Sequence, residues 1–283
     1  MLVIRSIQQL QTILAEHRLA GRSLGLVPTM GNLHQGHLQL VKTAQQHTDV
    51  VMVSLFVNPT QFGANEDLDS YPRTFQQDID KLDALNTDIL FAPTVDEIYP
   101  LGGDHSSHVH VPGITTVLCG ASRPGHFDGV TTIVSKLFNM SRADVAVFGE
   151  KDWQQLAVIR RMVIDLNIPI KIIGEPIVRE ADGLAMSSRN GYLSTEQRQL
   201  APALYTCLKD IKQALSDGER NYLALQEKAC AQLNKLGFRV DYLHILDPLK
   251  LTPPALDDQQ FIILVAAFNG DTRLIDNLHL ICT

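Results

Sequence analysis

The stretch Pro28-Thr29-Met30-Gly31-Asn32-Leu33-His34-Gln35-Gly36-His37 follows directly on the apolar run at residues 24–27. A short apolar run that ends at a proline is typical of a buried parallel strand. Residues 36–47 then place side chains at helical spacing, so the glycine-bearing turn is expected to open a helix. The pattern predicts a strand, a turn and a helix whose N-terminus suits an anion such as a phosphate.

His34 and His37 stand three residues apart in this stretch, which places both imidazoles on one side of a first helical turn. Two imidazoles there could donate hydrogen bonds to a single polyphosphate. Two alternatives stay open at this point. An H-x-x-H pair can ligate a metal, although no third ligand with the usual spacing lies nearby, and the pair can also be purely structural.

The composition is that of an ordinary globular protein, with 45% hydrophobic and 19% charged residues among 283. The net charge of −7 argues against a general nucleic-acid or anionic-membrane partner, because such proteins usually carry a basic surface. The longest apolar runs are too short to span a bilayer, and no signal-peptide core is seen. The four scattered cysteines form no C-x-x-C pair, which favours reduced thiols. We therefore expect a cytoplasmic protein.

Strand-like and helix-like segments alternate through the first 177 residues. Strands are expected at residues 24–27, 49–57, 88–91, 144–148 and 168–173, with an exposed strand at 107–111. Helices are expected at residues 7–18, 36–47, 75–85 and 130–140, and a further helix ends near 166. This alternation predicts an α/β fold with a doubly wound, Rossmann-like parallel sheet.

The pattern changes in residues 178–283. Ser194 or Thr195 is expected to cap a helix, and helical stretches continue to about residue 236. Strands are expected at residues 238–246, 261–268 and 273–280, and Asn269-Gly270 between the last two is a strong hairpin signal. The sequence therefore predicts two domains, residues 1–177 and a smaller C-terminal α+β domain at residues 178–283.

Polar side chains follow two of the predicted strands, and ligands in open α/β sheets bind outside the carboxyl ends of strands. Asn58 and Gln61 follow one strand, although an ordinary Asn-Pro turn is the alternative. Lys151 follows another, and residues 187–189 add two hydroxyls and a guanidinium that suit phosphate oxygens. Taken alone, residues 187–189 also fit a flexible serine-rich loop.

The chain resembles a known family in these stretches. His34-Gln35-Gly36-His37 is similar to the HIGH motif of the class I nucleotidyltransferase-like superfamily, and PTMGNLHQGH as a whole resembles the signature of the pantothenate synthetases. FVNPTQF, DLDSYPRT, RPGHFDGV, FGEKDWQQ and DGLAMSSRN follow in that family's order. The A-M-S-S-R form resembles the counterpart of the KMSKS loop, without its lysines.

The resemblance implies a ligase that condenses pantoate with β-alanine at the expense of ATP. It implies a pantoyl-adenylate intermediate, release of AMP and pyrophosphate, and a place in pantothenate and coenzyme A biosynthesis. The implied catalytic residues are His34, His37, Lys151 and Arg189. The implied ATP-binding residues are Met30, Gly31, His34, Gly36, His37, Gly149, Glu150, Lys151, Asp152, Val178, Met186, Ser187, Ser188 and Arg189. The implied contacts to pantoate and β-alanine are Met30, Asn58, Gln61, Arg123, His126 and Gln155.

Further expectations concern the metal and the assembly. Mg²⁺ should accompany ATP, and Asp78 stands where relatives have an acidic cluster, although Gln76 and Gln77 replace its neighbours here. The small domain is expected to act as a lid. The resemblance also implies a homodimer.

Two other functions compete with this one. An adenylyltransferase of the same superfamily would transfer AMP to a phosphate acceptor and should need additional basic residues. A nucleotide-binding regulatory module would not need Lys151 and the Ser-Ser-Arg loop together. Neutral glutamines at positions 61 and 155 favour a substrate with hydroxyl groups.

Overall fold

The computed structural model describes residues 1–63 and 66–282. It divides into two compact units. The N-terminal unit comprises residues 1–150 and 154–176, and the C-terminal unit comprises residues 151–153 and 177–283. The predicted boundary after residue 177 lies one residue from the boundary after residue 176. The sequence did not reveal that residues 151–153 pack with the C-terminal unit.

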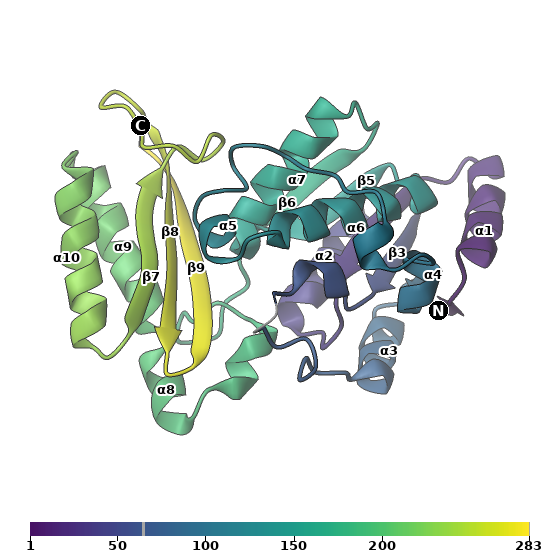
Figure 1. Cartoon of the computed structure of the whole chain (residues 1–283), viewed down its shortest axis with the longest axis horizontal. Helices are drawn as coiled ribbons and strands as arrows, with labels where there is room; N and C mark the ends of the chain where they lie inside the picture. The colour runs from purple at the N-terminus through teal and green to yellow at the C-terminus, as the bar shows by residue number, and fades with distance from the viewer. Residues whose placement is uncertain (64–65, 283) are drawn as a thin grey trace. The chain divides into compact units, whose positions relative to one another are not determined.

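The N-terminal unit contains a six-stranded sheet in the order β1-β4-β3-β2-β5-β6, in which every pairing is parallel (Figure 1). Its strands are β1 (Leu2–Ile4), β2 (Leu24–Thr29), β3 (Val50–Leu55), β4 (Ile89–Phe91), β5 (Val145–Gly149) and β6 (Lys171–Glu175). The order reverses direction at β2, which lies between β3 and β5. The doubly wound, Rossmann-like sheet predicted from the sequence is therefore confirmed.

Helices cover both faces of this sheet, because alternate strand residues point to opposite sides. Leu26 and Met52 face a core shared with α1 (Ile7–Leu19), α6 (His126–Ser141) and α7 (Trp153–Asp165). Val27 and Val53 face the opposite core, shared with α2 (Gln35–His47) and α3 (Phe75–Ala84). The remaining short helices of this unit are η1 (Pro59–Gln61), α4 (Val95–Ile98), η2 (Gly103–His105), α5 (Cys119–Ser122) and η3 (Glu150–Asp152), the last of which runs into the C-terminal unit.

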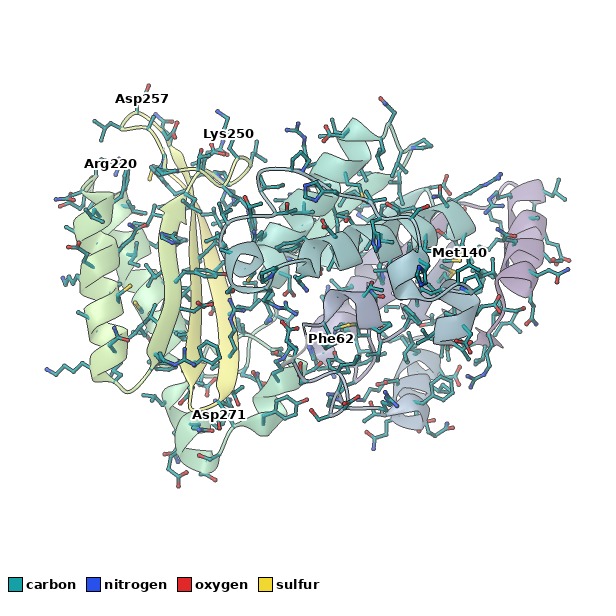
Figure 2. The ribbon with its side chains drawn as sticks, in the orientation of Figure 1. Phe62, Met140, Arg220, Lys250, Asp257 and Asp271 are labelled. Carbon is teal, nitrogen blue, oxygen red and sulfur yellow. The ribbon has the colours of Figure 1, made fainter. Side chains whose placement is uncertain are left out.

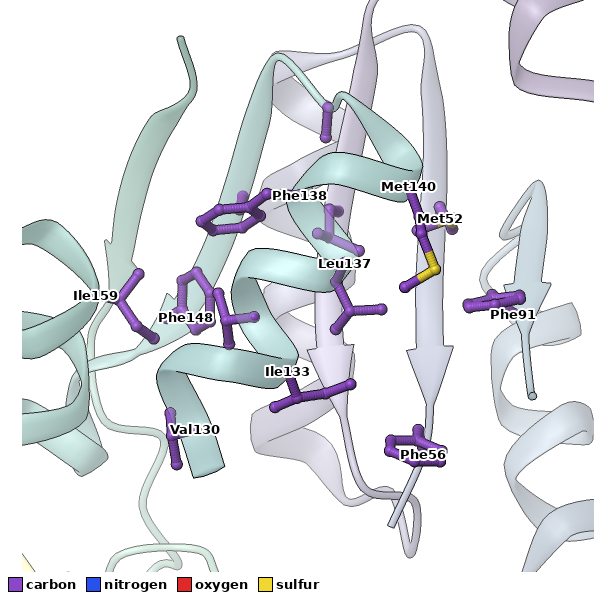
Figure 3. Packing of buried hydrophobic residues seen from close by; sticks show 14 of the residues in the cluster. Met52, Phe56, Phe91, Val130, Ile133, Leu137, Phe138, Met140, Phe148 and Ile159 are labelled. Carbon is purple, nitrogen blue, oxygen red and sulfur yellow. The ribbon is translucent and has the colours of Figure 1, made fainter. Parts of the chain in front are cut away.

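Helix α6 shows how sequence spacing produces this packing. Val130, Ile133 and Leu137 recur at helical intervals, and all three are buried. Figure 3 shows them on the side of α6 that faces the strands, together with Phe138 and the strand residue Phe148. The apolar stripe therefore fixes α6 across the sheet and sets the position of its N-terminal end beside η1.

Strand β2 is longer than predicted and continues through Pro28 to Thr29. Its pairing with β5 involves only Gly25 and Leu26, whereas its pairing with β3 continues to Thr29. Pro28 lacks an N–H, and it stands where the β5 side of β2 is no longer paired. β2 and β5 therefore separate at their carboxyl ends, at the point where the strand order reverses, and such points are the usual ligand sites of these sheets.

One strand of this unit was not predicted, and one predicted strand was wrong. Residues 2–4 form the edge strand β1, which three residues without a repeating pattern did not reveal. Residues 107–111 form no strand. There, the backbone N–H of Val109 donates to the Thr132 hydroxyl and the Val109 carbonyl accepts from the Thr131 hydroxyl, so α6 satisfies the backbone groups that a neighbouring strand would otherwise pair.

The C-terminal unit is an α+β domain, as predicted. Its antiparallel sheet runs β7-β8-β9 and comprises β7 (Arg239–Leu246), β8 (Gln260–Asn269) and β9 (Thr272–Ile281). The predicted Asn-Gly hairpin joins β8 to β9, with Gly270 at φ +61°, and Figure 2 labels Asp271 at this turn. Its helices are η4 (Ser188–Tyr192), α8 (Thr195–Leu200), α9 (Ala203–Ser216) and α10 (Tyr222–Lys235), and α9 and α10 share a core with β8. Among the described helices of the whole chain, none is long and apolar enough to cross a membrane.

Candidate active site

The turn after β2 is held by one buried carboxylate. Gly31 has φ +84° and Asn32 has φ +49°, so the backbone curls here in the left-handed region that glycine and asparagine tolerate best. The N–H groups of Asn32 and Leu33 donate to the carboxylate of Asp78 on α3, at 2.9 and 2.8 Å. Asp78 is 0% exposed and also accepts from the Thr74 hydroxyl at 3.1 Å. Its carboxylate therefore satisfies two backbone N–H groups of the turn and fixes the conformation of the turn.

This geometry argues against Asp78 as the metal ligand that the sequence suggested. Its two oxygens accept hydrogen bonds from three donors, whose positive ends would repel a cation at the same place. Thr74 is the N-cap residue of α3, but its hydroxyl donates to Asp78 and does not cap a backbone N–H. Within residues 1–63 and 66–282, no cluster of three or more His, Cys, Asp or Glu side chains could hold a metal ion.

His34 and His37 cap the N-terminus of α2. The N–H of Gly36 donates to Nδ1 of His34 at 3.1 Å, and the N–H of His34 donates to Nδ1 of His37 at 3.3 Å. The two ring centroids are 4.1 Å apart, so the sequence correctly placed both imidazoles on one side. A nitrogen that accepts an N–H carries no proton, so each neutral ring has its proton on Nε2. Both histidines can therefore donate from Nε2 beside a helix N-terminus.

Gln61 and Met30 meet at this edge of the sheet. Nε2 of Gln61 donates to the Met30 sulfur at 3.1 Å, and a thioether is a weak acceptor. Oε1 of Gln61 accepts from Nδ2 of Asn58 at 3.1 Å. Gln61 therefore presents an amide donor that rests on a weak acceptor.

Asn58 itself is buried, with 1% exposure. Its Nδ2 also donates to the Gly129 carbonyl at 3.1 Å, and its Oδ1 accepts from the hydroxyls of Tyr99 and Thr60 at 2.9 and 3.0 Å. Because the amide has two donors and two acceptor sites, its capacity is fully used inside the protein. Asn58 orients Gln61, and it is not placed as the direct substrate contact that the sequence suggested.

Arg123 and His126 also act on Gln61. The guanidinium of Arg123 binds the Glu66 carboxylate in a bidentate manner, at 2.6 and 2.5 Å, and lies 3.0 Å from Nε2 of His126. Nδ1 of His126 lies 2.8 Å from the Gln61 carbonyl. Burial raises the pKa of Glu66, but the hydrogen bonds and charge of Arg123 outweigh it and hold the pKa below its usual 4.5.

Two neighbouring glutamines at the start of α7 have different surroundings. Gln154 is buried, accepts from the Cys119 N–H, and donates to the carbonyls of Ile114 and Val117 at 2.8 and 2.7 Å. Gln155 is half-buried. Gln154, which the sequence did not single out, therefore fixes residues 114–119.

Gly149 is the last residue of β5, and Glu150 follows it. An added Cβ at Gly149 would meet no atom within 4 Å, so open space lies beside this backbone. Glu175, the partner of Gly149 in β6, accepts from the Thr43 hydroxyl of α2 at 2.6 Å. The end of β5 is thereby tied to the helix that His34 and His37 cap.

The other predicted phosphate contacts belong to the C-terminal unit. The Lys151 carbonyl accepts from the Asn277 side chain at 2.9 Å, and Asp152 is exposed. The Trp153 indole donates to the Pro248 carbonyl at 2.9 Å and packs on His279, with ring centroids 5.3 Å apart. Residues of β9 thus position the segment that carries Lys151.

The A-M-S-S-R stretch follows a small hairpin. The Met186 N–H donates to the Val178 carbonyl at 3.0 Å, and Arg179 pairs with Ala185. Ser187 caps η4 by accepting from the Arg189 N–H at 3.2 Å. Val178 and Met186, both among the residues that the resemblance implies for ATP binding, therefore lie side by side, and Ser187, Ser188 and Arg189 follow directly.

Asp276 and Arg179 form a buried ion pair beneath this hairpin. Two parallel hydrogen bonds of 2.7 and 2.9 Å join the guanidinium to the carboxylate. Burial raises the pKa of Asp276, and the guanidinium of Arg179 opposes this shift. Neither residue was predicted, and an isolated Asp in a β-rich run gives no sequence signal for such a pair.

Within each unit, several of the residues singled out from the sequence lie close together. The N-terminal unit brings together the histidine cap, Met30 and Gln61 at the carboxyl edge of its parallel sheet, and the C-terminal unit brings together Lys151 and the 178–189 segment along β9. The class defined by this fold and these groups is an α/β protein in which a histidine-capped helix N-terminus, an arrangement that suits an anion, lies at the switch point of a parallel sheet.

Comparisons with known proteins narrow this class. The model of the pantoate-beta-alanine ligase family matches residues 2–279. A pantothenate synthetase of Pseudomonas fluorescens strain Pf0-1 is 55% identical over 277 residues, covering 98% of this chain and 97% of that protein. A pantothenate synthetase of Marinobacter nauticus is 52% identical over 280 residues, covering 99% of each.

Solved structures agree. The crystal structure of pantothenate synthetase from Thermus thermophilus has a TM-score of 0.92 and 42% identity, covering 98% of this chain and 99% of that one. The pantoate-beta-alanine ligase of Francisella tularensis, solved with beta-gamma ATP and beta-alanine, has a TM-score of 0.83 and 35% identity, covering 98% and 97%. The chain belongs to the pantoate–β-alanine ligase family, and it is a ligase.

Proposed function

We propose that this enzyme joins pantoate to β-alanine through a pantoyl-adenylate. A carboxylate oxygen of pantoate attacks the α-phosphorus of ATP, and the bond from that phosphorus to the bridging oxygen breaks, so pyrophosphate leaves. The β-alanine amine then attacks the acyl carbon, AMP leaves with the bonding electron pair, and the amine loses a proton. The product is pantothenate, a precursor of coenzyme A.

The observation that carries this proposal is the histidine cap of α2. Nδ1 of His34 and Nδ1 of His37 are used by backbone N–H groups, which makes Nε2 of each ring a donor at a helix N-terminus. Such donors stabilise negative charge that grows on phosphate during transfer. We assign His37 to the reacting phosphate and His34 to the phosphates beside it.

Lys151, Ser187, Ser188 and Arg189 provide the remaining phosphate contacts in this proposal. A lysine ammonium is a point charge, and an arginine guanidinium can bind two phosphate oxygens at once. Gly149, Glu150 and Asp152 contact the ribose side of the nucleotide, and the backbone of Val178 and Met186 contacts adenine. Met30, Gly31 and Gly36 line the path of the phosphates.

Pantoate is held by Gln61 and Gln155 through its hydroxyl groups. The Gln61 amide supports this role, because its donor rests on the Met30 thioether, a weak acceptor that a hydroxyl can displace. Asn58, Arg123 and His126 act one step further out and fix the side chain and carbonyl of Gln61.

Mg²⁺ is proposed to accompany ATP. The described residues offer no cluster of acidic ligands, which fits an ion that keeps water and phosphate oxygens as most of its ligands. When bound, the ion would neutralise charge on the phosphates. Lys151 and Arg189 would hold the same phosphates from the protein side.

We also propose that the enzyme is a homodimer in the cytoplasm. Scattered cysteines that form no disulfide among the described residues support a reducing compartment. A sizing column tests the dimer, and a mass equal to one 31.4 kDa chain would exclude it.

The test of the reaction is incubation with ATP, pantoate and β-alanine. We expect pantothenate, AMP and pyrophosphate in equal amounts. ADP in place of AMP would exclude the adenylate route, and AMP transfer that persists in the product would indicate an adenylyltransferase. Nucleotide binding without turnover would favour a regulatory module.

A further inference from the structure

Arg179 is the centre of a buried network in the C-terminal unit. Beyond its two hydrogen bonds to Asp276, its Nη1 donates to the Gly183 carbonyl at 3.0 Å and its Nη2 donates to the Asn277 carbonyl at 3.2 Å. Its guanidinium carbon lies 3.7 Å from the centroid of the Tyr205 ring. The side chain therefore fastens the tip of the 178–186 hairpin to β9 and to α9.

Gly183 belongs to the same network, because its carbonyl accepts from Arg179 and its backbone lies against the Tyr205 ring. It has φ +95°, and a Cβ added there would lie 2.6 Å from Cδ1 of Tyr205. Glycine is needed both for the backbone angle and for the close approach of the ring. The hairpin tip therefore has a single packed position under Tyr205, where its carbonyl faces the guanidinium of Arg179.

Asn277 extends the network to Lys151. Asn277 is 3% exposed, and its Nδ2 donates to the Lys151 carbonyl at 2.9 Å. Its backbone N–H donates to Asp276 at 2.7 Å, and its carbonyl accepts from Arg179. The same residue thus touches the ion pair beneath the hairpin and the backbone of the lysine.

The geometry of a β-strand explains how two adjacent residues can do this. Successive side chains point to opposite faces of a sheet. Asp276 lies on the face that Leu274 and Leu280 share with the helices, where Tyr205 and Arg179 are found. Asn277 points to the other face, where the segment 151–153 packs, because Trp153 contacts His279 two residues further along β9.

We propose that Asp276 and Asn277 are positioning residues that hold Lys151 and the 178–189 segment in one fixed arrangement for the ATP phosphates. This inference rests on the proposed function, in which Lys151, Ser187, Ser188 and Arg189 contact those phosphates. In this role, neither Asp276 nor Asn277 needs to touch the substrate. They act by fixing the backbone that carries the charged groups, so that little reorganisation is needed when ATP binds.

The test separates the two half-reactions. Pyrophosphate release from ATP and pantoate needs the triphosphate contacts, whereas attack of β-alanine on preformed pantoyl-adenylate does not involve pyrophosphate. We expect Asn277→Ala to lower the rate of pyrophosphate release by about tenfold to a hundredfold, the scale for a displaced catalytic group. Its β-alanine step should stay near the wild-type rate.

Arg179→Lys is the second variant, because removing Asp276 would leave a buried arginine unpaired and could prevent folding. Lysine keeps the charge but lacks the planar fork that binds the carboxylate and stacks on Tyr205. We expect the same selective loss. Asp241→Asn is the matched control, since it breaks the Asp241–Arg273 pair of 2.8 Å in the same sheet without touching the network, and it should keep both rates.

Thermal unfolding of all variants shows whether they are folded at the assay temperature. If the folded Asn277→Ala and Arg179→Lys variants release pyrophosphate at the wild-type rate, the inference is overturned and the proposed function is unaffected. An equal loss in both half-reactions would also overturn the inference, because a loss that does not distinguish the two steps indicates a general structural defect. If the wild-type enzyme releases no pyrophosphate, the proposed function fails first.

Discussion

His34 and His37 serve α2 as Ser, Thr or Asp side chains usually serve a helix, because each accepts a backbone N–H at the first turn. A serine cap has nothing further to offer a ligand once its oxygen is used. An imidazole has a second nitrogen about 2 Å away from the first, which keeps a proton for another partner. The cap and the proposed phosphate contact are therefore two ends of the same ring.

His37→Ala should reduce turnover by roughly 10²–10³, the scale for removing one preorganised donor to developing charge. It should also lower the unfolding free energy by about 1 kcal/mol, because a capping acceptor is lost. Steady-state kinetics and thermal unfolding measure the two effects separately.

His37→Asn is the matched variant, because its amide oxygen can still accept the His34 N–H while the distal donor is gone. We expect wild-type stability with the same loss of turnover. His47→Ala, at the exposed far end of α2, should change neither quantity. Wild-type turnover in His37→Asn would contradict the proposed role of Nε2.

Gln154 and Gln155 make a second contrast at the scale of single residues. Gln155→Ala should weaken pantoate by about tenfold to a hundredfold, which corresponds to the roughly 1–3 kcal/mol cost of an unpaired polar group, and should leave ATP almost unaffected. Gln154→Ala should instead lower the melting temperature, because the backbone groups of Cys119, Ile114 and Val117 lose their hydrogen-bond partner. Equal losses for both substrates in Gln155→Ala would count against the assignment.

At the scale of elements, Glu66 ties its segment to the residues that precede α6. The folded-state pKa of Glu66 lies below its usual 4.5, so the contact with Arg123 stabilises the protein above about pH 4.5 and is lost as the pH falls through the folded value. The contribution is on the order of 1 kcal/mol, since the pair is bidentate but partly exposed.

Glu66→Gln should remove this contribution. We expect the variant to be less stable than the wild type at pH 7 and the difference to shrink below pH 4.5. Thermal unfolding between pH 3.5 and pH 7 measures it, with Asp165→Gln, which breaks the exposed Arg161–Asp165 pair, as the control. A difference that stays constant over this range would show that the charge of Glu66 is not involved.

Elements with a strong local pattern were predicted well from the sequence. The helix at α2, the strands β3 and β5 and the β8–β9 hairpin each carry a periodic run with a turn signal, and the structure confirms them. Residues 107–111 alternate like a strand, but the threonines of α6 claim the backbone of Val109. That competition depends on tertiary contacts and leaves no mark in the local pattern.

The site shows the same limit. Motif residues such as His34, His37 and Gln61 could be named because their types suit phosphate or hydroxyl groups. The positioning roles of Asp78, Asp276 and Asn277 could not be predicted, because these residues are distant in sequence from the backbone and side-chain groups that they hold. Asp78 was even assigned to a metal, since an acidic residue gives no hint that backbone N–H groups will saturate it.

At the scale of the whole molecule, the adenylate must be kept from water until the amine arrives, so we expect residues 181–191 to become more ordered when ATP and Mg²⁺ bind. Gly183 is already packed against Tyr205, so the change should concentrate after it, in residues 186–191. Hydrogen exchange with and without ATP measures this.

The hydrogen-bonded core of β8 provides the internal comparison, since it should exchange slowly in both states. Slower exchange within residues 181–191, concentrated at 186–191, is the expected outcome. Exchange there that ATP does not alter would reject the lid, and pyrophosphate release that strictly requires β-alanine would reject the adenylate-first order.

The three-residue excursion at 151–153 has a consequence for how this chain can be divided. The polypeptide passes between its two units three times, after residues 150, 153 and 176, where a conventional tandem arrangement would pass once. A gene fragment ending at residue 176 would keep every strand of the parallel sheet. In that fragment, however, the Trp153 indole would lose its hydrogen bond to the Pro248 carbonyl, and the Lys151 carbonyl would lose its hydrogen bond from Asn277. The smaller unit is thus no detachable module. Deleting it, or exchanging it for that of a distant relative, would also remove the support of a lysine that lies 126 residues before Asn277 in the chain.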